Sequence, residues 1–213
     1  MTFERAMVIL FTKVAQTVIA ERFTHTFFDN DGNRVRKVFA YLFSVFIAIF
    51  VNLFFHKPIF NFLSIFLGLS AIALSYNGTI KRKCIFVFYI LAVSCLIDLV
   101  VSAFLIKPFG YDGYSAFVSI FALLLLHATQ LITERFFEND LGIELNNRYW
   151  LFIIASLLVC IITSIVIFMD KTVSSFSLSL VCGAFLLVNI IISYLMDDLV
   201  KSSQKALENQ ALR

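Results

Sequence analysis

The sequence has few residues that interrupt helices and few charges. Its 213 residues include only two prolines, Pro58 and Pro108, and seven glycines, so long stretches are free to be helical. Charged residues make up 15% of the chain and hydrophobic residues 61%, whereas a soluble domain is about one quarter charged and about half apolar. A water-soluble fold of this size could not bury so many apolar side chains, so we expect most of the chain to face lipid.

Motifs that mark catalysis or metal binding are also missing from the sequence. It holds no nucleophile elbow, P-loop or HExxH motif, and its net charge of +3 is too small to indicate nucleic acid as a partner. The cysteines form no CxxC and are typical of small buried hydrophobes; they are Cys84, Cys95, Cys160 and Cys182. We therefore expect no cofactor, no metal site and no catalytic residue in this chain.

Long apolar segments are what the sequence has instead. A helix needs about 20 apolar residues to cross the hydrocarbon core of a bilayer, and six segments qualify: Val38–Phe55, Ile59–Tyr76, Cys84–Ile106, Ser115–Ile132, Trp150–Met169 and Ser177–Met196. A seventh, Glu4–Phe23, is interrupted by a polar stripe of Lys13, Gln16, Thr17 and Glu21. This stripe either faces the interior of a helix bundle or makes the segment an amphipathic helix at the interface, and we favour a spanning helix. The predicted fold class is an all-α membrane protein, a bundle of seven transmembrane helices, or of six if the first does not span, over residues 1–196.

Charges in the loops predict the orientation of this bundle. Counted by connection, eleven of the 17 Lys and Arg residues fall on one side: Arg34, Arg36, Lys37, Lys81, Arg82, Lys83, Arg135, Arg148, Lys201, Lys205 and Arg213. Only four fall on the other side: Arg5, Lys57, Lys107 and Lys171. Because cytoplasmic loops carry the excess of Lys and Arg, we expect a multi-pass protein of the plasma membrane with a cytoplasmic C-terminus and short outer loops.

Two of the outer stretches are rich in aromatic residues. They are "FFHKP" at 54–58 and "IKPFGYDGY" at 106–114. Aromatic residues at the bilayer boundary are either interfacial anchors or, on a second interpretation, the rim of a pocket. On the second interpretation the candidate ligand-binding residues are Phe54, Phe55, His56, Phe109, Tyr111 and Tyr114.

Ionisable and polar residues within the apolar segments are costly there, and each is therefore a candidate site. Asp98, in "CLIDLVV", lies at a depth similar to that of Lys13. We expect Asp98 to pair with Lys13 or to accept a hydrogen bond from Asn52 or Asn61, with ligand sensing and transport as alternatives. Two further candidates are His127 and Asn189. A lone histidine such as His127 is more often a packing group than a metal ligand, and an asparagine such as Asn189 is typical of an interhelical hydrogen bond.

After the last apolar segment the chain continues, without Gly or Pro, into "YLMDDLVKSSQKALENQALR" at 194–213. The seven-residue spacing of Val200 to Leu207 and of Leu199 to Ala206 is typical of a short coiled-coil start. A solvated tail is the alternative. An unbroken helix here would carry a shift or rotation of the last membrane helix into the cytoplasm, so we predict a signalling helix over residues 197–213.

With these features the chain resembles the transmembrane sensor module of peptide-responsive GHKL-type histidine kinases, the AgrC-like group. The resemblance rests on "FFDNDGNRVRK" after the first helix, on "YNGTIKRKCIFVF" at the third connection, and on the C-terminal stretch, which is similar to a "YLYDKL…ENELL" pattern. It implies quorum sensing through a two-component system, with an extracellular, cyclic and hydrophobic peptide as the ligand. It also implies a homodimer in membrane lipid, and a cytoplasmic kinase domain and response regulator as partners. The kinase regions have no matching positions here, so no kinase residue is carried over.

The predicted function is therefore a non-catalytic membrane receptor module that binds a peptide at its outer face and passes a helix movement to a histidine kinase absent from this chain. Two other classes stay open. A small membrane transporter or its subunit would show helices broken near the middle of the membrane. A membrane peptidase that processes such peptides would need a cysteine and a histidine within reach of each other, as Cys84 and His127 would have to be.

Overall fold

A computed structural model describes residues 3–28, 33–55, 58–111, 115–137, 157–159 and 161–163 of the chain. The main elements in these ranges are α1 (Phe3–Phe27), α2 (Arg34–Phe54), α3 (Pro58–Ser75), α4 (Ile80–Val101), the π-helical turn η1 (Ser102–Ile106), α5 (Lys107–Phe109) and α6 (Ala116–Phe137). Every regular element in these ranges is helical, and none of them is a strand. The predicted all-α class is confirmed for this part of the chain.

Three of the described helices are long and apolar enough to cross a membrane: Arg34–Asn52 in α2, Ile80–Ile106 in α4 with η1, and Ala116–Arg135 in α6. The apolar part of α3, Ile59–Ser75, is shorter, and α1 with its charged residues is not among the three. By length and composition these helices suit a membrane protein. The count of seven spans stays a prediction, because Trp150–Met169 lies mostly, and Ser177–Met196 entirely, outside the described residues.

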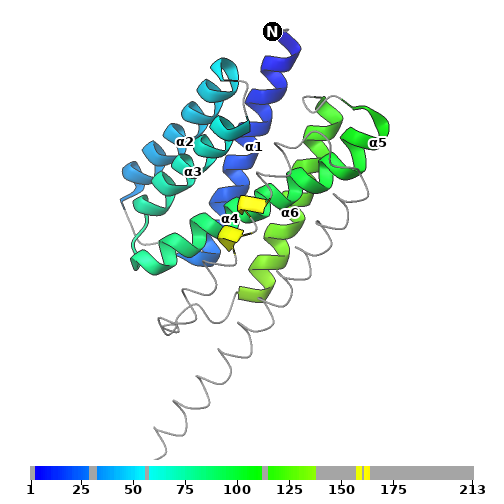
Figure 1. The fold of residues 1–213 in the computed structure, drawn as a ribbon. Coiled ribbons are helices and arrows are strands. Elements are labelled where there is room, and N and C mark those ends of the chain that lie inside the picture. The colour runs from blue at the N-terminus through cyan, green and yellow to red at the C-terminus, as the bar shows by residue number, and fades with distance from the viewer. Residues whose placement is uncertain are drawn as a thin grey trace, which may run out of the picture.

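The described helices run between two ends of a bundle (Figure 1). In that view α1 runs downward, α2 upward and α3 downward, α4 crosses the bundle obliquely, and α6 runs downward again. The most extensive helix contacts are those of α2 with α3 and of α1 with α6. These pairs, together with α4, enclose a common interior.

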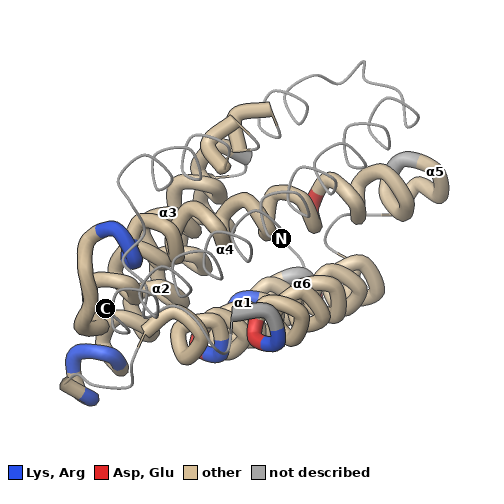
Figure 2. Tube along the Cα trace, turned by 90° about the horizontal axis from the view of Figure 1, so that it is seen from below, with Lys and Arg blue, Asp and Glu red and all other residues tan. Residues whose placement is uncertain are grey.

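One end of the bundle carries most of the described basic residues, and we call it the basic end. It is the end where α1, α3 and α6 finish and where α2 and α4 begin. Figure 2 looks at the bundle from below, the side of this end, and shows blue segments gathered around it. Its basic residues are Arg22, Arg34, Arg36, Lys37, Lys81, Arg82, Lys83 and Arg135. The other end, called the opposite end here, is formed by the α2–α3 connection, α5 and the first turn of α6.

Polar caps explain where helices begin at the basic end. Asn33 precedes α2, and its side chain accepts a hydrogen bond from Val35 N at 3.0 Å. Thr79 precedes α4 and accepts one from Arg82 N at 3.4 Å, which satisfies donors that a helix start leaves unpaired. Gly78 has φ of 148°, a backbone conformation that favours glycine. Both helices therefore start among basic residues, earlier than the apolar segments predicted from hydropathy.

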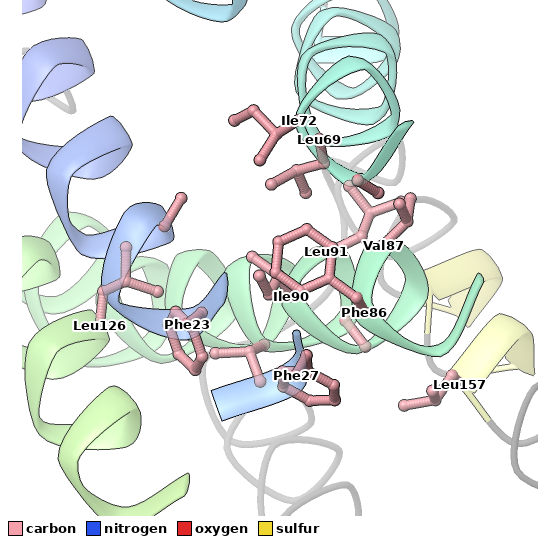
Figure 3. Close-up of a cluster of buried hydrophobic side chains, with 14 of the residues drawn as sticks. Phe23, Phe27, Leu69, Ile72, Phe86, Val87, Ile90, Leu91, Leu126 and Leu157 are labelled. Carbon is pink, nitrogen blue, oxygen red and sulfur yellow. The ribbon is translucent and has the colours of Figure 1, made fainter. Parts of the chain in front are cut away.

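The core of the described bundle is an aromatic cluster close to the basic end. We call it the aromatic core; its members are Phe23, Phe27, Phe28, Tyr76, Phe86 and Tyr89. Phe23 and Phe86 have no exposed surface. The rings of Phe27 and Phe86 meet edge to face, with centroids 5.7 Å apart, an arrangement that aromatic pairs prefer. Figure 3 shows Phe27 of α1 close to Phe86 of α4, with Leu126 of α6 beside Phe23.

Hydroxyl groups inside this core are satisfied by one another. Those of Thr24, Tyr41 and Tyr76 lie within 3.0 to 3.2 Å of each other and so join α1, α2 and the end of α3. The hydroxyls of Tyr89 and Thr133 are 2.7 Å apart and join α4 to α6. Because a buried polar group is costly without a partner, these contacts fix the helices relative to one another at the basic end.

Candidate functional site

The α2–α3 connection at the opposite end bears four phenylalanines in a row of ring contacts. We call Phe50, Phe54, Phe55 and Phe60 the hairpin aromatics. The ring centroids of Phe50 and Phe54 are 4.7 Å apart, and those of Phe55 and Phe60 are 4.9 Å apart. All four side chains are exposed, Phe54 to 66%. Exposed rings gathered at a helix turn can anchor the turn at the membrane interface or contact an apolar ligand.

The α5–α6 connection bears a second aromatic group, Phe109, Tyr111 and Phe117, which we call the loop aromatics. Centroid distances are 6.2 Å from Phe109 to Tyr111 and 5.5 Å from Tyr111 to Phe117. Phe109 is 70% exposed. Gly110, with φ of 68°, makes the left-handed turn that ends α5. In the view of Figure 1 the two connections stand on either side of α1.

Four of the six predicted ligand-binding residues thus belong to these two groups: Phe54, Phe55, Phe109 and Tyr111. The structure distributes them over two separate connections, and the sequence did not identify their ring partners in Phe50, Phe60 and Phe117. The other two candidates, His56 and Tyr114, lie outside the described residues.

A polar cavity of about 110 Å³ lies between the helices, on the side of the aromatic core that faces the opposite end. Five helices contribute to its wall, and the polar or charged residues in it are Lys13, Gln16, Thr17, Ser44, Asn61, Ser94 and Asp98. The rest of the wall is apolar and ends at Phe23 of the aromatic core. Three of the four residues in the predicted stripe on α1 therefore face the bundle interior, whereas Glu21 is exposed.

Lys13 and Asp98 are the two charged residues of this cavity, and they interact electrostatically. Lys13 is 9% exposed, and its Nζ donates a hydrogen bond to Gln16 Oε1 at 3.2 Å, one turn further along α1. Asp98 is exposed, whereas its neighbours Ile97 and Leu99 are buried. The structure thus brings the predicted partners to one cavity, with the amine held by Gln16 and the carboxylate open to the cavity.

The asparagines do not bind Asp98, which corrects one of the expected alternatives. Asn52 Nδ2 donates instead to Asn61 Oδ1 at 2.9 Å and to the carbonyl of Ala48 at 2.8 Å. The two asparagines are nine residues apart and face each other across the α2–α3 connection. The α2–α3 hairpin therefore brings the two asparagines into contact with each other.

On the side of the cavity formed by α2 and α3, the two helices approach each other closely at Gly68 of α3 and Ser44 of α2. A Cβ atom placed there would overlap Ser44 Oγ and lie 3.1 Å from Ser44 Cβ. Small residues at such a crossing let two membrane helices pack tightly. Ser44 also lines the cavity, so this crossing sets the position of one side of it.

The remaining predicted candidates are placed as follows. His127 is half-buried on α6, and the described residues contain no group of His, Cys, Asp and Glu that could hold a metal ion. Cys84 is half-buried at the start of α4. Asn189 and the predicted signalling-helix residues Leu199, Val200, Ala206 and Leu207 lie outside the described residues.

Sequence reasoning placed Gln16 in the polar stripe of α1 but missed Ser44 and Ser94 as parts of the same site. Each is an ordinary polar residue in an apolar helix, and only the packing of helices brings them to one cavity. The available signal was the polar stripe on α1, in which Lys13 and Gln16 have the i, i+3 spacing of neighbours on one helix face.

Comparisons of the chain with models of known protein families, with curated proteins and with solved structures find no match. The class that the fold itself defines is an α-helical protein with helices suited to a membrane, a charged interior cavity and two exposed aromatic groups at one end.

Proposed function

We propose that this chain is a non-catalytic membrane receptor module, of the kind found at the N-terminus of AgrC-like sensor kinases. Its ligand is a hydrophobic, cyclic peptide that binds at the opposite end of the bundle from the extracellular side. The observation that carries this proposal is the position of the two exposed aromatic groups at the same end, in the half of the bundle that contains the charged cavity.

The aromatic groups supply the binding energy in this proposal. Burying a fully water-exposed Phe side chain stabilises a complex by about 2 kcal/mol, and the hairpin and loop aromatics offer several partly exposed rings at helix ends. Phe54 and Phe109 are the most exposed of them, at 66% and 70%. A ligand with Phe, Leu or Ile side chains would remove these rings from the interface and pack them against its own apolar surface.

The proposed orientation follows from the charges at the basic end. In the described helices, most of the Lys and Arg residues lie at this end, where Figure 2 shows the blue segments gathered. Cytoplasmic connections carry such an excess. The opposite end then faces outward. The hydrophobic peptide would reach it from the medium or along the outer leaflet.

Signalling requires that the peptide bind two arrangements of the bundle unequally, because equal affinity shifts no equilibrium. We propose that binding repacks the cavity half, while the aromatic core holds the helices at the basic end. The resulting helix movement would pass to the last membrane helix and then to a kinase in a homodimer.

The proposal is tested by measuring the binding of peptides to the protein in lipid nanodiscs. The probes are a small panel of fluorescent cyclic peptides rich in Phe and Leu, with matched linear and polar cyclic peptides, measured by fluorescence polarisation. We expect at least one cyclic peptide to bind, and the Phe109→Ala/Tyr111→Ala variant to weaken it by about tenfold or more. Phe39→Ala, at a position of α2 that is 68% exposed and close to the basic end, is the control and should bind as the unmodified protein does.

Two results would contradict the proposal. One is the absence of binding by every cyclic peptide to protein that retains its helical circular dichroism and its melting temperature. The other is unchanged affinity in the double variant, which would place the ligand away from the loop aromatics.

A further inference from the structure

We propose that the Lys13–Asp98 cavity is a subsite for a neutral group of the ligand that both donates and accepts hydrogen bonds, and that this group is a carboxamide, as on an Asn or Gln side chain. This inference rests on the proposed function for the source of the group. It adds a specificity site to the receptor, distinct from the aromatic groups that provide affinity.

The charges of the cavity favour a neutral group. Lys13 repels a cation that approaches Asp98, and Asp98 repels an anion that approaches Lys13, because both side chains line the same small space. An apolar group leaves both charges without the hydrogen bonds that water would give them, which costs free energy. A neutral polar group avoids both penalties.

The hydrogen-bonding groups in the wall favour a carboxamide in particular. Lys13 can only donate, and it donates one hydrogen bond to Gln16. The carboxylate of Asp98 can only accept, and among the described residues none donates a hydrogen bond to it. A carboxamide has a carbonyl that accepts from Lys13 and an NH₂ that donates to Asp98.

The size and position of the cavity limit what can enter. About 110 Å³ holds several water molecules, and therefore the end of one side chain but not a whole peptide. Asn61, one residue after Phe60 of the hairpin aromatics, is part of the wall. The cavity thus extends to the level of the aromatic groups, so that a ligand held there can place one side chain inside.

Cysteine labelling tests the selectivity of the cavity without any peptide. Ser94, in the wall, is changed to cysteine in protein whose four native cysteines are alanine. The control is Asn77→Cys, at an exposed position in the α3–α4 connection outside the membrane-spanning stretches. Hydroxyethyl, aminoethyl and sulfonatoethyl methanethiosulfonates are applied in nanodiscs, where both faces are wet, and each rate is divided by the rate with free cysteine. We expect the neutral reagent to label Ser94→Cys fastest.

Charge variants show whether Lys13 and Asp98 cause this order. Lys13→Gln should raise the aminoethyl rate relative to the sulfonatoethyl rate by about tenfold, and Asp98→Asn should do the reverse. Because one charge alone can destabilise the bundle, the double variant Lys13→Gln/Asp98→Asn is made as well, and its three relative rates should become equal. Absence of labelling at Ser94→Cys, or an order that none of the charge variants changes, would overturn the proposal.

A peptide series then tests the source of the group. In the best cyclic binder, each residue in turn is varied among Gln, Met, Glu and Lys, and at one position the Gln peptide should bind about tenfold more tightly than the others. The preference should shift to the Glu peptide in Asp98→Asn and to the Lys peptide in Lys13→Gln. Tight binding that is indifferent to this residue at every tested position refutes the subsite but leaves the receptor proposal standing, whereas absence of binding by all cyclic peptides refutes the receptor proposal itself.

Discussion

The two halves of the described bundle treat their polar groups in opposite ways. In the half near the basic end, hydroxyls are enclosed by aromatic rings and paired at 2.7 to 3.2 Å. In the half near the opposite end, Lys13 and Asp98 face a cavity of about 110 Å³ and interact across it. Near the basic end most buried hydroxyls pair with one another, although Thr26 Oγ1 and Gln130 Oε1 are buried there without a hydrogen-bond partner among the described residues. The half near the opposite end instead holds two charged side chains that line a cavity.

This difference indicates which half can respond to a ligand. Closely packed interiors have discrete arrangements and deform little, so the aromatic core is suited to hold the ends of α1, α3 and α4 together. The charged and amide side chains that line the cavity can change their hydrogen-bond partners with little change in the packing of the helices. The comparison predicts that core substitutions act on stability, and cavity substitutions on what enters the bundle.

The largest expected effect comes from breaking the aromatic half. Phe86→Ala removes a ring with no exposed surface that contacts Phe27 and Phe28, and it should lower the free energy of unfolding by about 3 kcal/mol. Unfolding in bicelles by added SDS, followed by circular dichroism, measures this loss. Phe46→Ala, at a position that is 68% exposed, removes the same atoms and should change the free energy of unfolding by much less. Equal losses for the two variants would show that the core is not where the packing energy lies.

A smaller effect is expected at the boundary between the halves. Gly68→Ala places a methyl group against Ser44 and should destabilise the bundle by about 1 to 3 kcal/mol, as overpacking does. The Ser44→Gly/Gly68→Ala variant removes the obstructing atoms and should recover most of that loss. The same unfolding assay measures both variants. Failure of Ser44→Gly to rescue would mean that α2 and α3 are not held by this contact.

The sequence predicted the helices better than their ends. Hydropathy placed spans at Val38–Phe55 and Cys84–Ile106, and the structure starts α2 and α4 earlier, at Arg34 and Ile80. The polar caps Asn33 and Thr79 extend both helices into basic sequence that an apolar window does not include. Hydropathy reports the lipid-facing part of a helix, and capping decides where the helix begins.

The sequence was enough to associate Lys13 with Asp98 in the cavity. The distance of each residue from the end of its helix follows from a rise of about 1.5 Å per residue, and the two residues come out at similar depths in the membrane. The partners of the asparagines could not be found in this way. Asn52 and Asn61 bind each other because the α2–α3 turn brings them together, and depth alone did not separate this contact from one to Asp98. Which helices are neighbours depends on packing, for which a single sequence gives no direct signal.

The smallest expected effect compares one polar pair from each half. In a double-mutant cycle, Asn52→Leu and Asn61→Leu should couple by about 0.6 kcal/mol, the usual value for hydrogen bonds between membrane helices, because the cavity beside Asn61 lets water replace the lost partner. Tyr41→Phe and Tyr76→Phe should couple by about 1 kcal/mol, since Tyr76 is only 4% exposed and aromatic rings exclude water from its hydroxyl. Unfolding of the four single variants and two double variants in bicelles gives both coupling energies. A stronger coupling for the asparagines than for the tyrosines would mean that the cavity half is as closed as the core, and the proposed division between a responsive and a rigid half would have to be abandoned.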